Sequence, residues 1–190
     1  MKSVKRLGTY SVSLPLLADD VIEFHAARLL LLFNFCGVSG RIDGLTKMAK
    51  LDFFARYPDF FAVARRAALP NAMDGQESSE VPDATVEAAM VRHHYGPWDK
   101  RYYHVLAYLE AKKLITVTKH GKLYRLCLTD EGRARAKSLA EKASFAPLVE
   151  QMREIKKAFG TKSGSTLKKL IYRLFDEEVG RRPMGQVIES

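Results

Sequence analysis

A chain of 190 residues, 47% hydrophobic and 28% charged, has the size and composition of one globular domain, alone or with an appendage. Its net charge of +9 favours anionic partners, nucleic acid or an acidic protein face ahead of a membrane surface, although it also fits a basic protein that is merely well solvated. The most apolar stretch, residues 26–35, is too short to span a bilayer, and the N-terminus lacks the apolar run of a signal peptide.

The two cysteines, Cys36 and Cys127, lie far apart in apolar runs. This usage indicates buried free thiols and a reducing, cytoplasmic compartment.

The N-terminal half predicts an extended arm over residues 1–18 followed by helices. Asp20 and Glu23 resemble a capping box, which predicts a helix that begins near residue 19 and ends at Gly37. That helix is apolar on nearly every side, as expected of a central, buried element. Residues 41–43 form a short extended piece, and Gly44 allows a turn into a helix over 45–57, which Pro58 ends. A second apolar helix is predicted over 60–69.

The middle of the chain changes character. Residues 71–85 are polar and acidic, without a basic residue, and predict a surface insertion. A short helix is expected over 85–94, and the sequence Tyr95-Gly96-Pro97-Trp98-Asp99 is typical of a turn.

The segment from 100 to 128 predicts a helix that leads directly into a β-hairpin. The helix, over 100–113 with Asp99 as a possible cap, has one apolar face (Tyr102, Val105, Leu106 and Leu109) and one polar face (Arg101, His104, Tyr108 and Lys112). Residues 114–118 and 123–128 have the β-branched and alternating pattern of two strands, with Gly121 in the turn between them. Thr129 is placed to cap the next helix.

Two amphipathic helices are predicted in the C-terminal region, over 147–159 and 166–179. Apolar stripes this regular usually pack in the protein's own core. Helices outside a minimal domain also form interfaces with a partner or a second copy of the chain. The candidate interface residues are Leu148, Met152, Ile155, Phe159, Leu167, Leu170, Ile171 and Leu174.

Taken together, the elements predict a mainly α fold with a small β-hairpin, in the order of a winged helix-turn-helix. The winged-helix domain covers 19–141 with the acidic insertion at 71–85, and residues 142–190 form a helical extension. In this plan the helix before the hairpin enters the major groove of double-stranded DNA and the hairpin lies along the phosphates. The candidate nucleic-acid-binding residues are Lys47, Lys50, Arg101, His104, Tyr108, Lys112, Lys113, Lys119, Lys122 and Arg125.

Two alternatives to DNA contact stay open, because winged helices also dock proteins and a basic hairpin is often only a solvated surface. Phosphate contacts of this kind give affinity without sequence choice.

Two resemblances extend this prediction. The segment Leu-Thr-Asp-Glu-Gly-Arg-Ala-Arg-Ala at 128–136, behind the hairpin, resembles winged-helix regulators of the MarR and PadR type and supports the fold over residues 20–141. Three further segments, 41–54 (Arg-Ile-Asp-Gly-Leu-Thr-Lys-Met-Ala-Lys-Leu-Asp-Phe-Phe), 95–102 (Tyr-Gly-Pro-Trp-Asp-Lys-Arg-Tyr) and 171–175 (Ile-Tyr-Arg-Leu-Phe), resemble the middle component of bacterial three-component ABC systems, the Lamassu-type anti-phage operons.

The second resemblance implies a small winged-helix subunit beside an SMC-like ATPase and an effector, often a nuclease. The alternative function is a homodimeric winged-helix transcriptional regulator, which would bind a palindromic site.

The sequence offers no enzyme signature, and no catalytic residue, cofactor or metal is expected. Its five histidines form no His-Glu-x-x-His pair and its cysteines no Cys-x-x-Cys, so a zinc site lacks ligands. Residues 160–166, Gly-Thr-Lys-Ser-Gly-Ser-Thr, resemble a phosphate-binding loop only faintly, because the Gly-Lys-Ser/Thr ending is missing. They are interpreted as a linker in which Ser165 or Thr166 caps the following helix.

Overall fold

The computed structural model describes residues 21–68, 90–93 and 96–176, together with positions 179, 183, 184 and 188. The predictions made for the arm at 1–18 and for the acidic insertion at 71–85 lie outside the described residues. Within them the fold is mainly helical with a small antiparallel sheet, as the sequence predicts. Every helix there is too short or too polar to cross a lipid bilayer.

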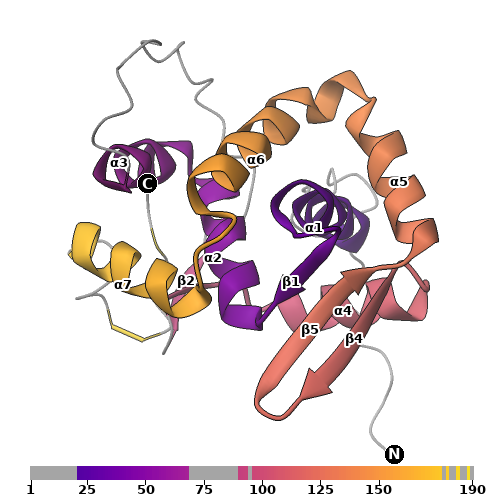
Figure 1. The fold of residues 1–190 in the computed structure, drawn as a ribbon, viewed down its shortest axis with the longest axis horizontal. Helices are drawn as coiled ribbons and strands as arrows, with labels where there is room; N and C mark the ends of the chain where they lie inside the picture. Colours follow the sequence, from indigo (N-terminus) through magenta and orange to yellow (C-terminus); the bar gives the residue numbers. More distant parts are fainter. Residues whose placement is uncertain are drawn as a thin grey trace, which may run out of the picture.

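The N-terminal half folds around a central helix. It contains α1 (Ile22–Cys36), β1 (Arg41–Asp43), α2 (Leu45–Arg56) and α3 (Pro58–Ala68). Helix α1 is surrounded by α2, α4, α5 and α6 (Figure 1), which explains why its sequence is apolar on nearly every side. Its N-cap is Val21, which makes no side-chain cap, and Asp20 of the predicted capping box lies outside the described residues. Glu23 accepts a hydrogen bond from the Tyr108 hydroxyl at 3.3 Å.

The middle of the chain contains two small sheets and the helix between them. Strands β2 (Val91–His93) and β3 (Gly96–Trp98) pair with each other, so the helix predicted over 85–94 is wrong at 91–93. Helix α4 (Tyr102–Ala111) then leads into β4 (Ile115–His120) and β5 (Leu123–Leu128). The hairpin is part of a three-stranded sheet of order β1-β5-β4, because the extended piece at 41–43 pairs with β5.

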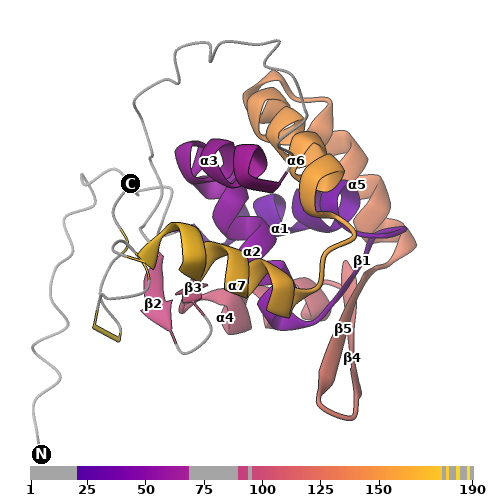
Figure 2. The same cartoon turned by 60° about the vertical axis from the view of Figure 1, so that its left-hand side comes forward.

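The C-terminal region contains α5 (Asp130–Ala140), the short 3-10 helix η2 (Ala143–Phe145), α6 (Ala146–Phe159) and α7 (Gly164–Leu174). Helix α6 packs on α1 and α2, and α7 packs on α2, so both cover the N-terminal helices (Figure 2). The β4–β5 hairpin stands away from this helical body in both views.

The predicted partner interface is wrong, because the apolar stripes of α6 and α7 pack inside the chain's own core. The buried members are Met152, Ile155, Phe159, Leu167, Leu170 and Ile171, and the half-buried Leu148 and Leu174 pack against them. The Phe159 ring lies 4.8 Å from that of Phe54 on α2, between centroids. These residues have an intramolecular role, since burying apolar area is the main driving force of folding.

A buried polar network ties α1, α2 and α4 together. The Arg28 guanidinium donates to both oxygens of the Asp52 carboxylate, at 2.9 and 3.3 Å. The Tyr102 hydroxyl donates to the same carboxylate at 2.7 Å. All three side chains are almost completely buried, and each charge has an opposite charge beside it, as buried charges require. Burial and the Asp52 charge raise the pKa of Tyr102 well above its ordinary value, so its hydroxyl remains a donor.

Candidate nucleic-acid interface

The start of α4 is fixed by the carboxylate of Asp99. Its Oδ1 accepts hydrogen bonds from the backbone N–H of Arg101 at 2.9 Å and from the Arg101 side chain at 3.1 Å. Its Oδ2 accepts one from Arg56 on α2 at 2.9 Å. Burial raises the pKa of Asp99, but these hydrogen bonds and the Arg56 charge lower it by more, so the net pKa lies below its ordinary value. Asp99 therefore anchors α4 to α2, whereas the helix N-cap itself is Arg101.

Helix α4 buries one stripe and exposes the opposite one. The buried stripe is the predicted one: Tyr102, Val105, Leu106 and Leu109. On the other side, Arg101 and Tyr108 are engaged by Asp99 and Glu23, whereas His104 and Lys112 are exposed. The exposed residues of α4 also include Tyr103, Ala107, Glu110 and Ala111, which are not among the predicted contact residues. The small side chains of Ala107 and Ala111 would allow the helix to approach the major groove of DNA closely.

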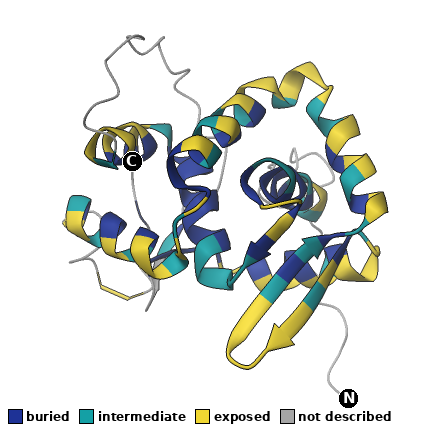
Figure 3. Cartoon of the chain, in the orientation of Figure 1, coloured by how far each residue is buried: buried dark blue, intermediate teal, exposed yellow. Residues whose placement is uncertain are grey.

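The hairpin has a tight turn and an exposed outer half (Figure 3). Gly121 adopts φ of +60° between the paired residues His120 and Leu123, so a two-residue turn closes the hairpin as predicted. Near the body, Ile115, Leu126 and Leu128 are buried and anchor the ribbon to the core. Most residues of the part beyond them are exposed.

The cations of the hairpin are not equivalent, because alternate residues of a strand face opposite sides. Lys119 pairs with Tyr124 and its Nζ lies 5.7 Å above that ring, whereas Arg125 pairs with Thr118 on the other face. There Arg125 donates to Asp43 of β1 at 3.2 Å, so it helps to hold the sheet together and is a weaker candidate for phosphate contact.

The exposed cations that remain are Lys112 and Lys113 at the end of α4, Lys119 on β4 and Lys122 in the turn. No acidic residue occurs between Ala111 and Thr129. The four lysines give this part of the chain an excess of positive charge over the one exposed carboxylate at the helix end, Glu110, which accepts from the Val117 N–H at 3.1 Å. Such an excess suits a polyanion.

Two lysines of α2 do not belong to this surface. Lys50 is completely buried and its Nζ donates to the Pro97 carbonyl at 2.8 Å, so the prediction that it binds nucleic acid is wrong. Burial, together with repulsion from Lys168, lowers its pKa to about 7. Lys47 is half-buried and donates to the Gly160 carbonyl at 2.8 Å, beside the α6–α7 loop.

Residues that could carry other chemistry have structural roles. The linker at 160–166 joins α6 to α7 as predicted, but the cap of α7 is Ser163, whose hydroxyl accepts from the Thr166 N–H at 3.1 Å. Both cysteines are free thiols; Cys36 is buried, which raises its pKa to about 12, and Cys127 is half-buried. In the part of the chain that the structure describes, no three His, Cys, Asp or Glu residues gather in a way that could hold a metal ion.

Comparison of this chain with models of protein families, with curated proteins and with solved structures finds no match.

Proposed function

We propose that this chain is a non-enzymatic winged-helix subunit that binds double-stranded DNA through α4 and the β4–β5 hairpin. In this proposal it works within a bacterial anti-phage complex and bridges an SMC-like ATPase and an effector. The observation that carries the DNA-binding part is the exposed, acid-free hairpin that directly follows a helix with one exposed face.

The order of elements supports the winged-helix part of the proposal. Helix α1, strand β1, helices α2 and α4, and strands β4 and β5 follow one another in the plan of that fold, with α3 and the β2–β3 pair inserted between α2 and α4. In that plan α4 is the recognition helix and the hairpin is the wing. Lys112, Lys113, Lys119 and Lys122 then face the phosphates on both sides of a groove.

The assignment to a defence complex rests on the sequence resemblance, and the packing of the three resembling segments is consistent with it. Lys50 on α2 binds the Pro97 carbonyl. The Phe53 and Phe175 rings lie 6.5 Å apart, between centroids. A Cβ on Gly96 would lie 3.4 Å from the Tyr172 ring. Three segments that are distant in sequence thus form one packed unit.

The alternative, a homodimeric regulator, needs an apolar face for the second copy. The two stripes considered for that purpose lie in the core, so they do not favour it.

Reversing two charges tests the wing. The double variant Lys119→Glu, Lys122→Glu should weaken binding to any duplex sequence, and should reduce the slope of log affinity against log salt by about 2, because each lost phosphate contact contributes about 0.9. Fluorescence anisotropy with a labelled duplex at several salt concentrations measures both quantities.

The matched control is Lys137→Glu, Lys142→Glu, which makes the same charge change at exposed positions on and after α5. If the two double variants lose DNA affinity equally, the wing acts only through the net charge of the protein. If the wing variant binds DNA as the wild type does, the wing does not contact DNA. Co-purification of the chain with a large ATPase tests the complex separately.

A further inference from the structure

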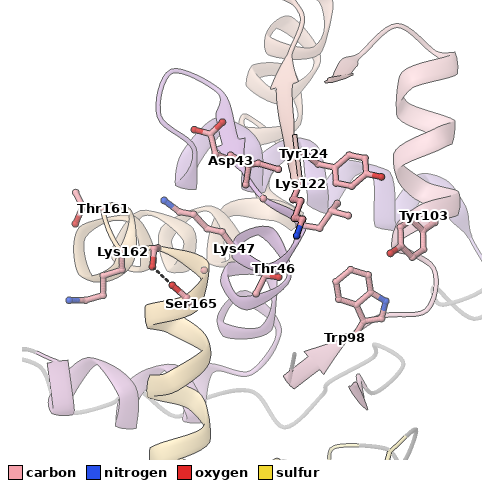
Figure 4. Close-up of a pocket in the computed structure, with 15 residues that line it drawn as sticks. Asp43, Thr46, Lys47, Trp98, Tyr103, Lys122, Tyr124, Thr161, Lys162 and Ser165 are labelled. Carbon is pink, nitrogen blue, oxygen red and sulfur yellow. Dashed lines mark hydrogen bonds between the residues drawn. The ribbon is translucent and has the colours of Figure 1, made fainter. Parts of the chain in front are cut away.

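A pocket of about 650 Å³ opens between the hairpin tip, the β1–α2 junction, the start of α4 and the α6–α7 loop (Figure 4). This volume lies in the range of small-molecule sites. The chain segments that line it are distant in sequence, and among them only the loop at 160–166 has a motif, the faint resemblance to a phosphate-binding loop. The proposed wing contributes its turn to this pocket and α4 contributes Tyr103, whereas the β1–α2 junction and the α6–α7 loop belong to elements that the DNA-binding proposal does not use.

One side of the pocket carries positive charge. Lys47, Lys122 and Lys162 line it from three different elements. Of the described residues that line it, one is acidic: Asp43, whose oxygens lie 3.3 Å from Arg41 and 3.2 Å from Arg125. That carboxylate is already engaged by two arginines. The positive charge of the lysines therefore favours an anion in the pocket.

The lysine side has a defined shape because the first turns of α2 and α7 meet there. A Cβ on Gly164 would lie 2.8 Å from the backbone nitrogen of Lys47, so the absence of a side chain permits this approach. The amino group of Lys47 is held by the Gly160 carbonyl, and the hydroxyls of Ser163 and Ser165 lie 2.8 Å apart. Lysines and hydroxyls on a fixed loop suit the oxygens of a phosphate group.

The other side of the pocket is aromatic. Figure 4 shows Trp98 and Tyr103 across the pocket from Lys162 and Ser165. The Trp98 ring packs edge-on against Tyr102, with centroids 5.1 Å apart, and is held in the core. Tyr103 is 62% exposed and its ring centroid lies 5.8 Å from that of Trp98. An exposed ring beside a fixed one is a surface on which a planar base can stack.

We propose that this pocket binds a nucleoside phosphate, with the phosphate at Lys47, Lys162 and Ser165 and the base against Tyr103 and Trp98. Two sources share this chemistry: a free nucleotide, and the terminal nucleotide of a DNA strand. Because the lysines and the aromatic rings lie on opposite sides of the pocket, only a ligand with both a phosphate and a base contacts both sides, which distinguishes the site from one for phosphate alone.

Intrinsic fluorescence tests the proposal directly, because Trp98 is the only tryptophan of the chain. ATP is titrated in one arm, and a short 5′-phosphorylated oligothymidylate and its unphosphorylated counterpart in the other. Saturable quenching by ATP, or by the phosphorylated oligonucleotide but not its counterpart, supports the proposal and identifies the source. Absence of saturable binding in both arms overturns the proposal. Pyrophosphate is titrated as a ligand without a base, and equal affinities for pyrophosphate and ATP would also overturn the proposal.

Variants measured by calorimetry identify the residues. Lys162→Ala should weaken binding about tenfold, through loss of a charged phosphate contact, and Tyr103→Ala should do so by about the same factor, through loss of base stacking. Ser165→Asp, which brings negative charge to an exposed position of the loop, gives a second test should Lys162→Ala fold poorly. Lys137→Ala and Ser144→Asp are exposed matched controls. Unchanged affinity in Lys162→Ala and Ser165→Asp would contradict the assignment.

The proposal for the wing and the proposal for the pocket can be refuted separately. A closed circular duplex has no strand ends and reports the wing alone; Lys162→Ala should leave its binding within about twofold, since the lysine lies outside the proposed duplex contacts. Lys119→Glu should weaken circle binding and leave nucleotide binding unchanged.

Discussion

At the scale of single residues, Lys50 shows how position in the fold decides what a charged side chain does. Its sequence neighbours are those of a surface lysine on an amphipathic helix, three residues after Lys47. The structure instead buries it under Pro97, with Gly96 against its side chain and Lys168 close enough to repel it. Both burial and repulsion disfavour the protonated form, so the pKa falls to about 7.

This pKa predicts the sign of a pH effect. The ordinary lysine pKa of 10.5 applies in the unfolded chain, which therefore binds more protons than the folded chain between pH 7 and 10.5. The free energy of unfolding must rise with pH in that window. Relative to Lys50→Met, the wild-type chain should gain about 2 kcal/mol between pH 7 and pH 9.

Urea unfolding of both chains at the two pH values measures this difference, with the exposed Lys137→Met as the matched control. Parallel pH profiles for wild type and Lys50→Met would show that Lys50 stays protonated in the fold.

At the scale of elements, the contact between the hairpin and α5 gives a structural role to the segment at 128–136, which the sequence analysis connects with winged-helix regulators by resemblance alone. The Thr129 hydroxyl accepts from the Gly132 N–H at 3.0 Å and donates to the Lys113 carbonyl at 2.7 Å. A Cβ on Gly132 would lie 1.9 Å from the Leu114 carbonyl oxygen. The first turn of α5 therefore packs directly on the backbone that leaves α4, which sets the direction of the hairpin.

The variant Gly132→Ala should consequently lose about 3 kcal/mol of unfolding free energy, because the clash is with backbone and cannot be relieved by rotating a side chain. Ser138→Ala, at an exposed position of the same helix, should change it by less than about 0.5 kcal/mol. Thermal or urea unfolding measures both. A cost for Gly132→Ala as small as that of the control would mean that α5 can move away from the hairpin freely.

At the scale of the whole molecule, the boundary predicted near residue 141 does not separate two cores. One continuous core includes α1 and α2 on one side of that position and α6 and α7 on the other. The Cys36 thiol on α1 donates to the Met152 carbonyl on α6 at 3.3 Å, and the Lys156 Nζ binds the Gly37 carbonyl at the end of α1 at 2.6 Å.

A chain ending at Glu141 should therefore fail to fold. It would lose the large apolar side chains that α6, α7 and Phe175 bury, each worth about 1.5–3 kcal/mol. Together they are as large as a typical net stability of about 5–15 kcal/mol, or larger. Far-ultraviolet circular dichroism and urea unfolding of the shortened chain check this outcome. A cooperative transition would instead support the autonomous domain that the sequence predicts for 19–141.

The sequence by itself determined most of the elements. The periodicity of the helices around residues 22–36, 45–56 and 146–159, the alternation of the two hairpin strands and the cap at Thr129 are local properties, and the structure confirms each of them. The pairing of β2 with β3 was missed, since strands of three residues are too short to show a pattern.

Only the tertiary structure decided what the side chains do. Apolar periodicity identifies a face that must be covered, but the same stripe on α6 or α7 can be covered by the chain's own core or by a partner. Likewise, a lysine can end in solvent, as Lys119 does, or under a backbone carbonyl, as Lys50 does. The pocket joins Trp98, Tyr103 and residues 43–47, 122–124 and 161–165, which lie together because long-range packing brings four segments to one place. Such proximity is a property of the whole fold and has no local signal.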